Sequence, residues 1–333
     1  MAGGLMRRRR SVDRKPIMPS GVHPTMTRAF NEPEPPRSAS RRPAHASARD
    51  RRLAIAAMAL SIPLSLTAIG DLRADLGANP PALRVCASKA AAPYAAVDGS
   101  GFENRIAAAV AEAMNRKAEF VWTDKPAIFL VRDMLDKGAC DVIVGVDDGD
   151  PRVLTTAPYY RTGYAFITRA DSPLKLSSWS DDDLSRVRRI AYQFHSPSEE
   201  MLKQTGLYED NLIYQYSLIN FTDRRNQYTQ VPGDVLVSEV AKGAADVAVA
   251  FAPDVARYVK ASGVPLRMTM IDRNGMTAAG KLVPQQFDQS MAVRKDDAAL
   301  RSELDAAIAK LRPQIVAILR EEGIPPMEPG LGQ

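Results

Sequence analysis

The sequence predicts an α/β protein of two lobes, each a mostly parallel sheet flanked by helices, with a two-stranded hinge between them. Short apolar runs alternate with helical periods from Leu83 onward, which favours sheets covered by helices. An eight-residue segment recurs 105 positions further along the chain, which favours two lobes built on one plan. The last strand and helix are too short for a third lobe, so the chain must return to the first.

The first lobe begins with alternating strands and helices. The pattern predicts a strand over 83–88, a helix over 102–114, a strand over 118–122, a helix over 128–135 and a strand over 140–146. The helix over 102–114 carries Phe102, Ile106, Val110 and Met114 at four-residue steps along one face. Strands that alternate with helices pair in parallel through right-handed crossovers, so we expect a doubly wound sheet.

The second lobe continues the alternation after a strand over 189–193. A helix begins next, with Ser196 as N-terminal cap, Pro197 in the first turn and Glu199 as capping-box partner. The alternation of strands and helices continues over 212–216, 235–240, 246–251, 253–259 and 266–271.

The internal repeat and the C-terminal end define the domain organisation. Lys137–Val144 and Lys242–Val249 are identical at six of eight positions, although coincidence in so short a stretch is the alternative. A strand over 289–294 and an amphipathic stretch over 296–318, bent or broken at Pro313, complete the chain. We therefore expect a discontinuous lobe 1 over 82–160 and 290–329, and lobe 2 over 163–287.

The N-terminal part has the composition of an export signal. Residues 1–74 hold 14 of the 44 basic and 5 of the 39 acidic residues, so residues 75–333 carry 30 basic against 34 acidic residues. That mildly acidic remainder argues against a nucleic-acid partner. Residues 49–74 combine an arginine cluster, a 17-residue apolar run and a polar end, which predicts a Sec-type signal peptide and a periplasmic location. The alternatives are an uncleaved anchor and twin-arginine export; after cleavage we expect no stable membrane insertion.

Residues 1–48 are too long for an ordinary leader. Their Arg, Pro and Ser content predicts disorder, or a start codon assigned too early, with Met18 or Met26 as the true initiator.

The two cysteines suggest a disulfide rather than a metal site. Cys86 and Cys140 are the only cysteines, and an oxidising compartment favours their pairing if the strand register brings them together. His195 is the one histidine after residue 74, and no cluster has metal-ligand spacing, so we expect neither a metal nor a cofactor. His195 also has no neighbouring acid to orient it, which favours a cleft-lining histidine over a catalytic base.

The predicted cleft and hinge residues follow the third strand. Ligands of open α/β sheets lie at the carboxyl ends of strands, where Asp147, Asp148 and Arg152 are found. Tyr159, Tyr160 and Arg161 come directly afterwards, where the chain leaves lobe 1. For Arg152, a surface ion pair with Asp148 or Asp150 is an equally good interpretation.

At these residues the chain resembles a known family. Over residues 82–329 it resembles type II periplasmic solute-binding proteins, and more closely the J accessory proteins of bacterial methanol oxidation (MxaJ/XoxJ type). The resemblance is carried by Leu83–Ala87, Gly101–Arg105, Asp150–Thr156, Pro158–Arg161 and Pro284–Ser290.

The resemblance implies a periplasmic, non-catalytic accessory protein of a PQQ-dependent methanol dehydrogenase. Amino-acid-binding relatives hold the ligand carboxylate with an arginine after the third strand, and the ligand ammonium with an acid where this chain has Phe251. Phe251 cannot pair with an ammonium, and Asp147 and Asp148 would repel an anion, so we expect no high-affinity amino-acid binding.

The alternative function is the substrate-binding subunit of an ABC transporter for a small organic solute, since the cleft could still hold a small molecule. Some exported proteins of this fold are dehydratases. The sequence offers no evident acid/base pair, so we expect no enzyme.

Overall fold

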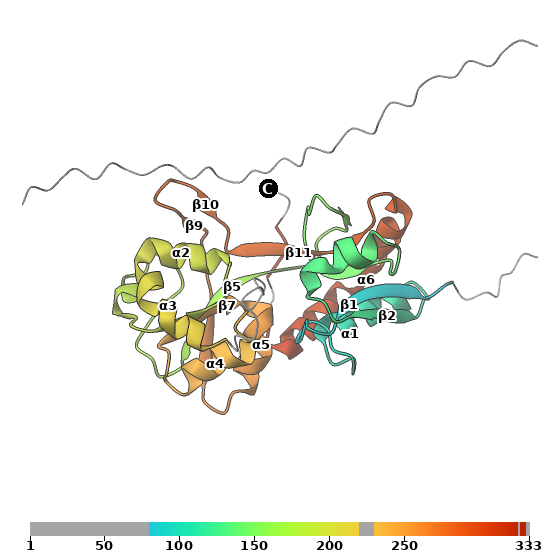
Figure 1. Ribbon diagram of the computed structural model, residues 1–333. Helices are drawn as coiled ribbons and strands as arrows, with labels where there is room; N and C mark the ends of the chain where they lie inside the picture. The colour runs from blue at the N-terminus through green and yellow to red at the C-terminus, as the bar shows by residue number, and fades with distance from the viewer. Residues whose placement is uncertain (1–79, 220–229, 326, 331–333) are drawn as a thin grey trace, which may run out of the picture. The chain divides into compact units, whose positions relative to one another are not determined.

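The computed structural model describes residues 80–219, 230–325 and 327–330 (Figure 1). The predicted extension 1–48 and signal peptide 49–74 lie outside the described residues. No helix in the described part of the chain has the length and apolar character needed to cross a membrane.

The described chain alternates strands and helices, as predicted. The strands are β1 Leu83–Ser88, β2 Ala118–Thr123, β3 Ile143–Asp147, β4 Leu154–Thr155, β5 Tyr160–Arg169, β6 Ile190–Tyr192, β7 Val247–Phe251, β8 Leu266–Met270, β9 Gly275–Met276, β10 Leu282–Val283 and β11 Gln286–Val293. The α-helices are α1 Phe102–Ala113, α2 Pro197–Thr205, α3 Leu207–Ser217, α4 Gly233–Ala241, α5 Ala252–Ala261 and α6 Ala298–Glu322.

The α/β class is confirmed, but the sheets are mixed rather than mostly parallel. β1 pairs in parallel with β2, and a larger sheet has the order β3-β11-β5-β7-β6, with β4 on β11 and β8 on β5. In that sheet the β6–β7 pair is parallel, whereas β11 and β5 pair antiparallel with each other and with their other neighbours. β1 reaches β3 through a single parallel bridge, between Val85 and Val142.

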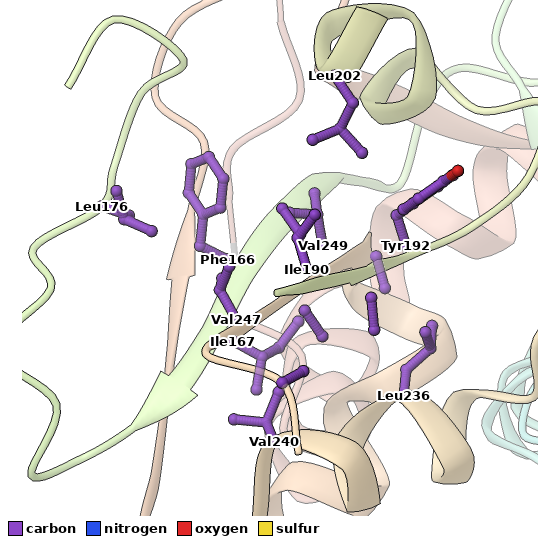
Figure 2. Close-up of a cluster of buried hydrophobic side chains, with 14 of the residues drawn as sticks. Phe166, Ile167, Leu176, Ile190, Tyr192, Leu202, Leu236, Val240, Val247 and Val249 are labelled. Carbon is purple, nitrogen blue, oxygen red and sulfur yellow. The ribbon is translucent and has the colours of Figure 1, made fainter. Parts of the chain in front are cut away.

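The buried apolar side chains form separate cores. One core draws its buried members from the range 166–283, and Figure 2 shows part of it, with Phe166, Leu202 and Leu236 around the strands. A second core combines residues of 83–160 with residues of 291–324 and takes Ala256 from elsewhere. Lobe 1 and lobe 2 denote the predicted ranges 82–160 with 290–329 and 163–287, whose boundaries stay a prediction. β5 and β11 pair where the two ranges meet; Gln286 lies opposite Gly163 at one end of the pairing and Gln289 opposite Tyr160 at the other.

The repeated segment makes the same contacts in both copies. In the first, the Arg84 backbone N–H donates to the Asp141 carboxylate (3.3 Å), and the Asp141 N–H donates to the Arg84 carbonyl (2.8 Å). In the second, Arg189 and Asp246 exchange the same two bonds, each 2.9 Å long. The shared Gly-Ala-x-Asp sequence therefore fastens the start of a buried strand to its neighbour in each lobe.

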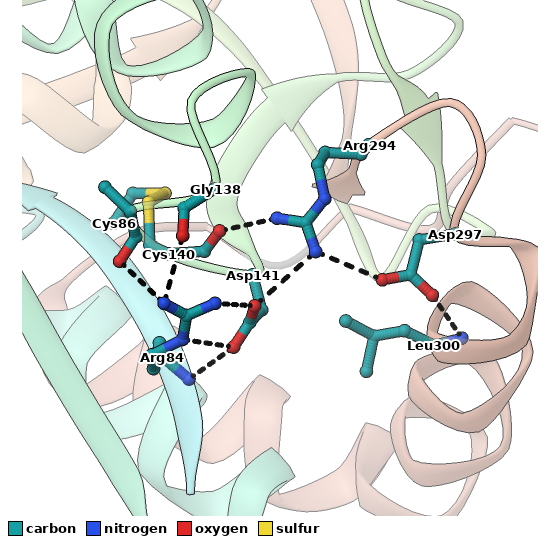
Figure 3. Close-up of polar contacts among 9 residues, drawn as sticks. Arg84, Cys86, Gly138, Cys140, Asp141, Arg294, Asp297 and Leu300 are labelled. Atoms are coloured by element: carbon teal, nitrogen blue, oxygen red, sulfur yellow. Dashed lines mark hydrogen bonds and ion pairs between the residues drawn. A yellow bond between two sulfur atoms is a disulfide. The ribbon is translucent and has the colours of Figure 1, made fainter.

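A disulfide joins Cys86 on β1 to Cys140, with the Cα atoms 5.4 Å apart, which confirms the predicted pair. Figure 3 shows the polar network beside it. Arg84 Nη2 lies 2.6 Å from Asp141 Oδ1, and Arg294 Nη1 donates to the Cys140 carbonyl at 2.7 Å. Arg294 precedes α6, so this network connects the returning C-terminal segment to β1.

The implied strand over 212–216 is wrong, because that stretch lies within α3. Asn211 and Gln215 are four residues apart and face β6, where their side-chain oxygens accept the N–H groups of Ile190 and Tyr192. A helix thus supplies hydrogen-bond acceptors for the backbone N–H groups at the edge of β6. These tertiary hydrogen bonds override the local pattern that favours a strand.

Two predicted helices differ in detail. The stretch over 128–135 forms a 3-10 turn, Ala127–Phe129, followed by a π-helical segment, Val131–Leu135. Pro313 lies inside α6, which continues past it as one helix of 25 residues.

Candidate functional site

A cleft opens where the predicted lobe ranges meet, and its larger part is a pocket of about 460 Å³. That volume suits a small organic molecule. Lobe 1 contributes Asp147 from the end of β3, and all the other lining residues come from lobe 2. The lining residues are Asp147, Tyr164, Gln193, Phe194, His195, Ser196, Pro197, Gln230, Phe251, Asp254 and Phe287.

A second pocket, of about 350 Å³, lies mostly on lobe 1. Its lining includes the disulfide residue Cys86 together with Glu103, Arg152 and Gln289. Asp147 and Phe251 line both pockets, so the two pockets are neighbouring parts of one cleft.

Three aromatic rings stand together on the wall of the first pocket. Tyr164 on β5 and Phe251 on β7 are cross-strand partners with ring centroids 5.4 Å apart. Phe287 on β11 completes the group, 6.3 Å from Tyr164 and 6.2 Å from Phe251. Each ring touches the other two at spacings typical of aromatic pairs, which gives the pocket an apolar, π-rich wall.

Asp254 is the acidic group that sequence reasoning missed. It lies in the first turn of α5, three residues after Phe251, and its carboxylate accepts a hydrogen bond from Gln193 Nε2. The Gln193 amide is oriented by its oxygen, which accepts the Phe251 N–H at 2.8 Å. Burial raises the pKa of Asp254, although the hydrogen bonds from Gln193 and Tyr94 oppose the shift.

Glu103 brings a second carboxyl group to the cleft from the first turn of α1. Its Oε1 is buried and finds no hydrogen-bond partner among the described residues. Gly145 packs against it with φ +73°, a backbone conformation that favours glycine, and a Cβ there would lie 1.8 Å from Oε1, so a larger residue would also have to displace the Glu103 carboxyl group. Burial, and secondarily the negative charge of Asp254, raises the pKa of Glu103 well above its ordinary value.

Tyrosines complete the polar interior. The Tyr159 hydroxyl accepts the Gly145 N–H at 3.1 Å, and Tyr160 is buried beside it with its hydroxyl unpaired among the described residues. Burial raises the pKa of both well above the usual value, so they stay neutral. Carboxyl groups in such surroundings, without a basic partner, are suited to hold a proton or to pair with a cation.

The structure brings four of the predicted cleft residues to the pockets: Asp147, Arg152, His195 and Phe251. Asp147 Oδ1 accepts a 2.7 Å hydrogen bond from Gln289. His195 is exposed at the rim, with φ 54° and its N–H bonded to Glu199.

Arg152 forms an ion pair, as the alternative interpretation had it. Its Nε and Nη2 contact both carboxylate oxygens of Asp150, with a shortest distance of 2.6 Å. The hydrogen bond from Arg152 lowers the pKa of Asp150, so the pair is ionised on both sides.

The other predicted residues lie away from the pocket walls. Asp148 accepts from Thr155 and Ser290 at 3.0 and 3.1 Å. Arg161 pairs with Asp288 at 3.1 Å, beside the β5–β11 connection. Tyr159 and Tyr160 belong to the lobe 1 core and reach the cleft only through their neighbours.

Asp254 and Glu103 were overlooked because acids in the first turn of a helix are common for reasons of capping and dipole. One signal was available for Asp254, which follows the carboxyl end of the predicted strand 246–251, as Asp147 follows that of 140–146.

Comparison with known proteins gives a consistent family. The family described as bacterial extracellular solute-binding proteins, family 3, matches residues 83–317. A protein named MoxJ from Methylorubrum extorquens is 56% identical over 243 residues, which cover 73% of this chain and 81% of that protein. A MoxJ of Paracoccus denitrificans is 49% identical over 243 residues, covering 73% of this chain and 88% of that protein.

Solved structures agree on the fold. The crystal structure of MxaJ from Methlophaga aminisulfidivorans MPT superimposes with a TM-score of 0.70 at 48% identity, covering 74% of this chain and all of that chain. The periplasmic binding protein XoxJ from Methylobacterium extorquens AM1 gives a TM-score of 0.54 at 24% identity, covering 74% of this chain and 99% of that chain.

Proposed function

Because the chain belongs to family 3 of the bacterial extracellular solute-binding proteins, and within it to the MoxJ proteins, we propose that it is an accessory protein of methanol oxidation in the periplasm. The observation that carries the proposal is the 56% identity to MoxJ, which extends over 243 residues. We propose further that its partner is a PQQ-dependent methanol dehydrogenase and that the protein itself is not catalytic.

The cleft supports a role other than amino-acid transport. An amino-acid carboxylate needs a free guanidinium, whereas Arg152 is held by both oxygens of Asp150. Asp147 adds negative charge at the same place, since it lines both pockets.

Association with the dehydrogenase is tested with the purified pair from one host. Residues 75–333 carry a net charge of −4 (30 basic against 34 acidic residues), so a basic face on the dehydrogenase would speed encounter. We expect cross-linked or co-eluting complex at low ionic strength and less of it as salt rises. If no complex forms with the cofactor-loaded dehydrogenase at any salt concentration, the partner proposal is contradicted.

The alternative is the binding subunit of a transporter, which the 460 Å³ pocket favours. Loss of uptake of one small organic solute in a deletion strain, with methanol oxidation unchanged, would select this alternative.

A further inference from the structure

The larger pocket combines three aromatic rings with two carboxylates and, among the described residues that line it, has neither lysine nor arginine. We propose that this pocket binds a small organic cation that carries no carboxylate group, such as an alkylated ammonium. The inference stands apart from the accessory role, since a ligand of this class would fit under either function proposed above.

The aromatic wall supplies the first half of the recognition. Tyr164, Phe251 and Phe287 come from three adjacent strands, so their rings are fixed by the sheet rather than by a loop. Their centroids lie 5.4 to 6.3 Å from one another, close enough for one cation on the pocket side to contact more than one ring. A ring quadrupole attracts a weakly hydrated organic cation while leaving an anion without stabilisation.

The carboxylates supply the second half. Asp254 is held by Gln193, whose amide orientation is set by the Phe251 N–H, and Asp147 is held by Gln289. Both acids therefore stand in defined positions on the pocket wall from opposite lobes. The unpartnered, buried Oε1 of Glu103, in the adjoining pocket, adds an acceptor that no described residue satisfies.

The charges around the cleft exclude a zwitterion. The adjoining pocket is lined by Arg152, but the guanidinium of Arg152 is already paired with the Asp150 carboxylate. Among the described residues lining the larger pocket, His195 at the rim is the only one with a basic side chain. A carboxylate attached to the cation would thus meet Asp147 and Asp254 without a counter-charge, which costs free energy.

Calorimetric titration of the full protein with a matched panel tests the proposal. The probes are tetramethylammonium, choline and glycine betaine, because glycine betaine keeps the trimethylammonium head and adds a carboxylate; sodium acetate tests the carboxylate alone. We expect saturable binding of choline or tetramethylammonium, at least tenfold weaker binding of glycine betaine and none of acetate. No cation binding at millimolar concentration, or equal binding of choline and glycine betaine, would overturn the proposal.

Variants distinguish this pocket from a general charge effect. Asp254→Asn keeps the side-chain shape and should weaken cation binding at least tenfold. Phe287→Leu keeps an apolar side chain without a π face and should weaken it severalfold. The matched control is Asp210→Asn, which removes an exposed charge on α3 and should leave affinity unchanged.

Melting curves establish whether each variant is folded. If one pocket variant does not fold, the cation affinity of the other still tests the pocket. If folded D254N binds the cation with the same affinity as the D210N control, whether or not both bind more weakly than the parent, the cation binds elsewhere.

Discussion

Replacement of both Cys86 and Cys140 by alanine should lower the free energy of unfolding of lobe 1 by about 4 kcal/mol. The disulfide spans a sequence separation of 54 residues. Closing a loop of that length removes roughly 14 cal/mol/K of entropy from the unfolded chain, or about 4 kcal/mol at 25 °C.

The two tryptophans allow the effect to be measured in lobe 1 alone. Trp122 lies on β2, directly across from Ala87, next to Cys86, whereas Trp179 belongs to the lobe 2 core. In a Trp179→Phe background, urea unfolding followed by Trp122 fluorescence compares the oxidised protein with the double cysteine variant. The slope of free energy against urea should rise in the double variant, because its unfolded chain is less compact without the crosslink, so the two proteins are compared by their free energies extrapolated to zero urea.

Reduction of the unfolded parent protein provides the control, because it removes the bond without changing the sequence. A midpoint for the double variant equal to that of the oxidised parent, or two titratable thiols in the unfolded, unreduced parent, would refute the reasoning.

Three further predictions concern the cleft. Gly149→Ala, with φ +75° and open space around it, should destabilise by about 1 kcal/mol. Gly145→Ala, with φ +73°, should cost more, because its Cβ must also displace the Glu103 carboxyl group; urea unfolding measures both, and equal losses would contradict the close approach. Burial, and secondarily the charge of Asp254, raises the folded-state pKa of Glu103 above its ordinary value of 4.5, so the parent loses stability as pH rises above that value. Glu103→Gln cannot ionise, so its stability relative to the parent should increase with pH above 4.5 in urea unfolding, and a difference that stays constant with pH would argue against the shift. Standard amino acids should show no dissociation constant near the micromolar level in calorimetric titration, because Arg152 is already paired; micromolar binding of any one would restore the transport function.

Local patterns were sufficient where one periodicity dominated. The strand over 83–88 and the helix from Phe102 were predicted nearly to the residue, because the strand is a short apolar run buried on both faces and the helix has one apolar face against the core. The cap at Ser196 was also correct, since its hydroxyl accepts the Glu199 N–H at 3.1 Å. The Glu199 carboxylate, however, accepts the N–H of His195 rather than the N–H of Ser196 that a capping box predicts.

Tertiary contacts decided what the sequence could not indicate. α3 forms because Asn211 and Gln215 satisfy the edge of β6, and this requires knowledge of which strand lies beneath. The same holds for the candidate site. The three-ring wall depends on the antiparallel register that places Tyr164 opposite Phe251, and a mostly parallel sheet does not predict it.

The accessory role itself is tested most directly by deleting the gene in its host and measuring methanol dehydrogenase activity in periplasmic extract, normalised to the amount of dehydrogenase polypeptide. We expect lower specific activity in the deletion strain, restored by the intact gene supplied in trans. Unchanged specific activity and unchanged growth on methanol in the deletion strain would contradict it.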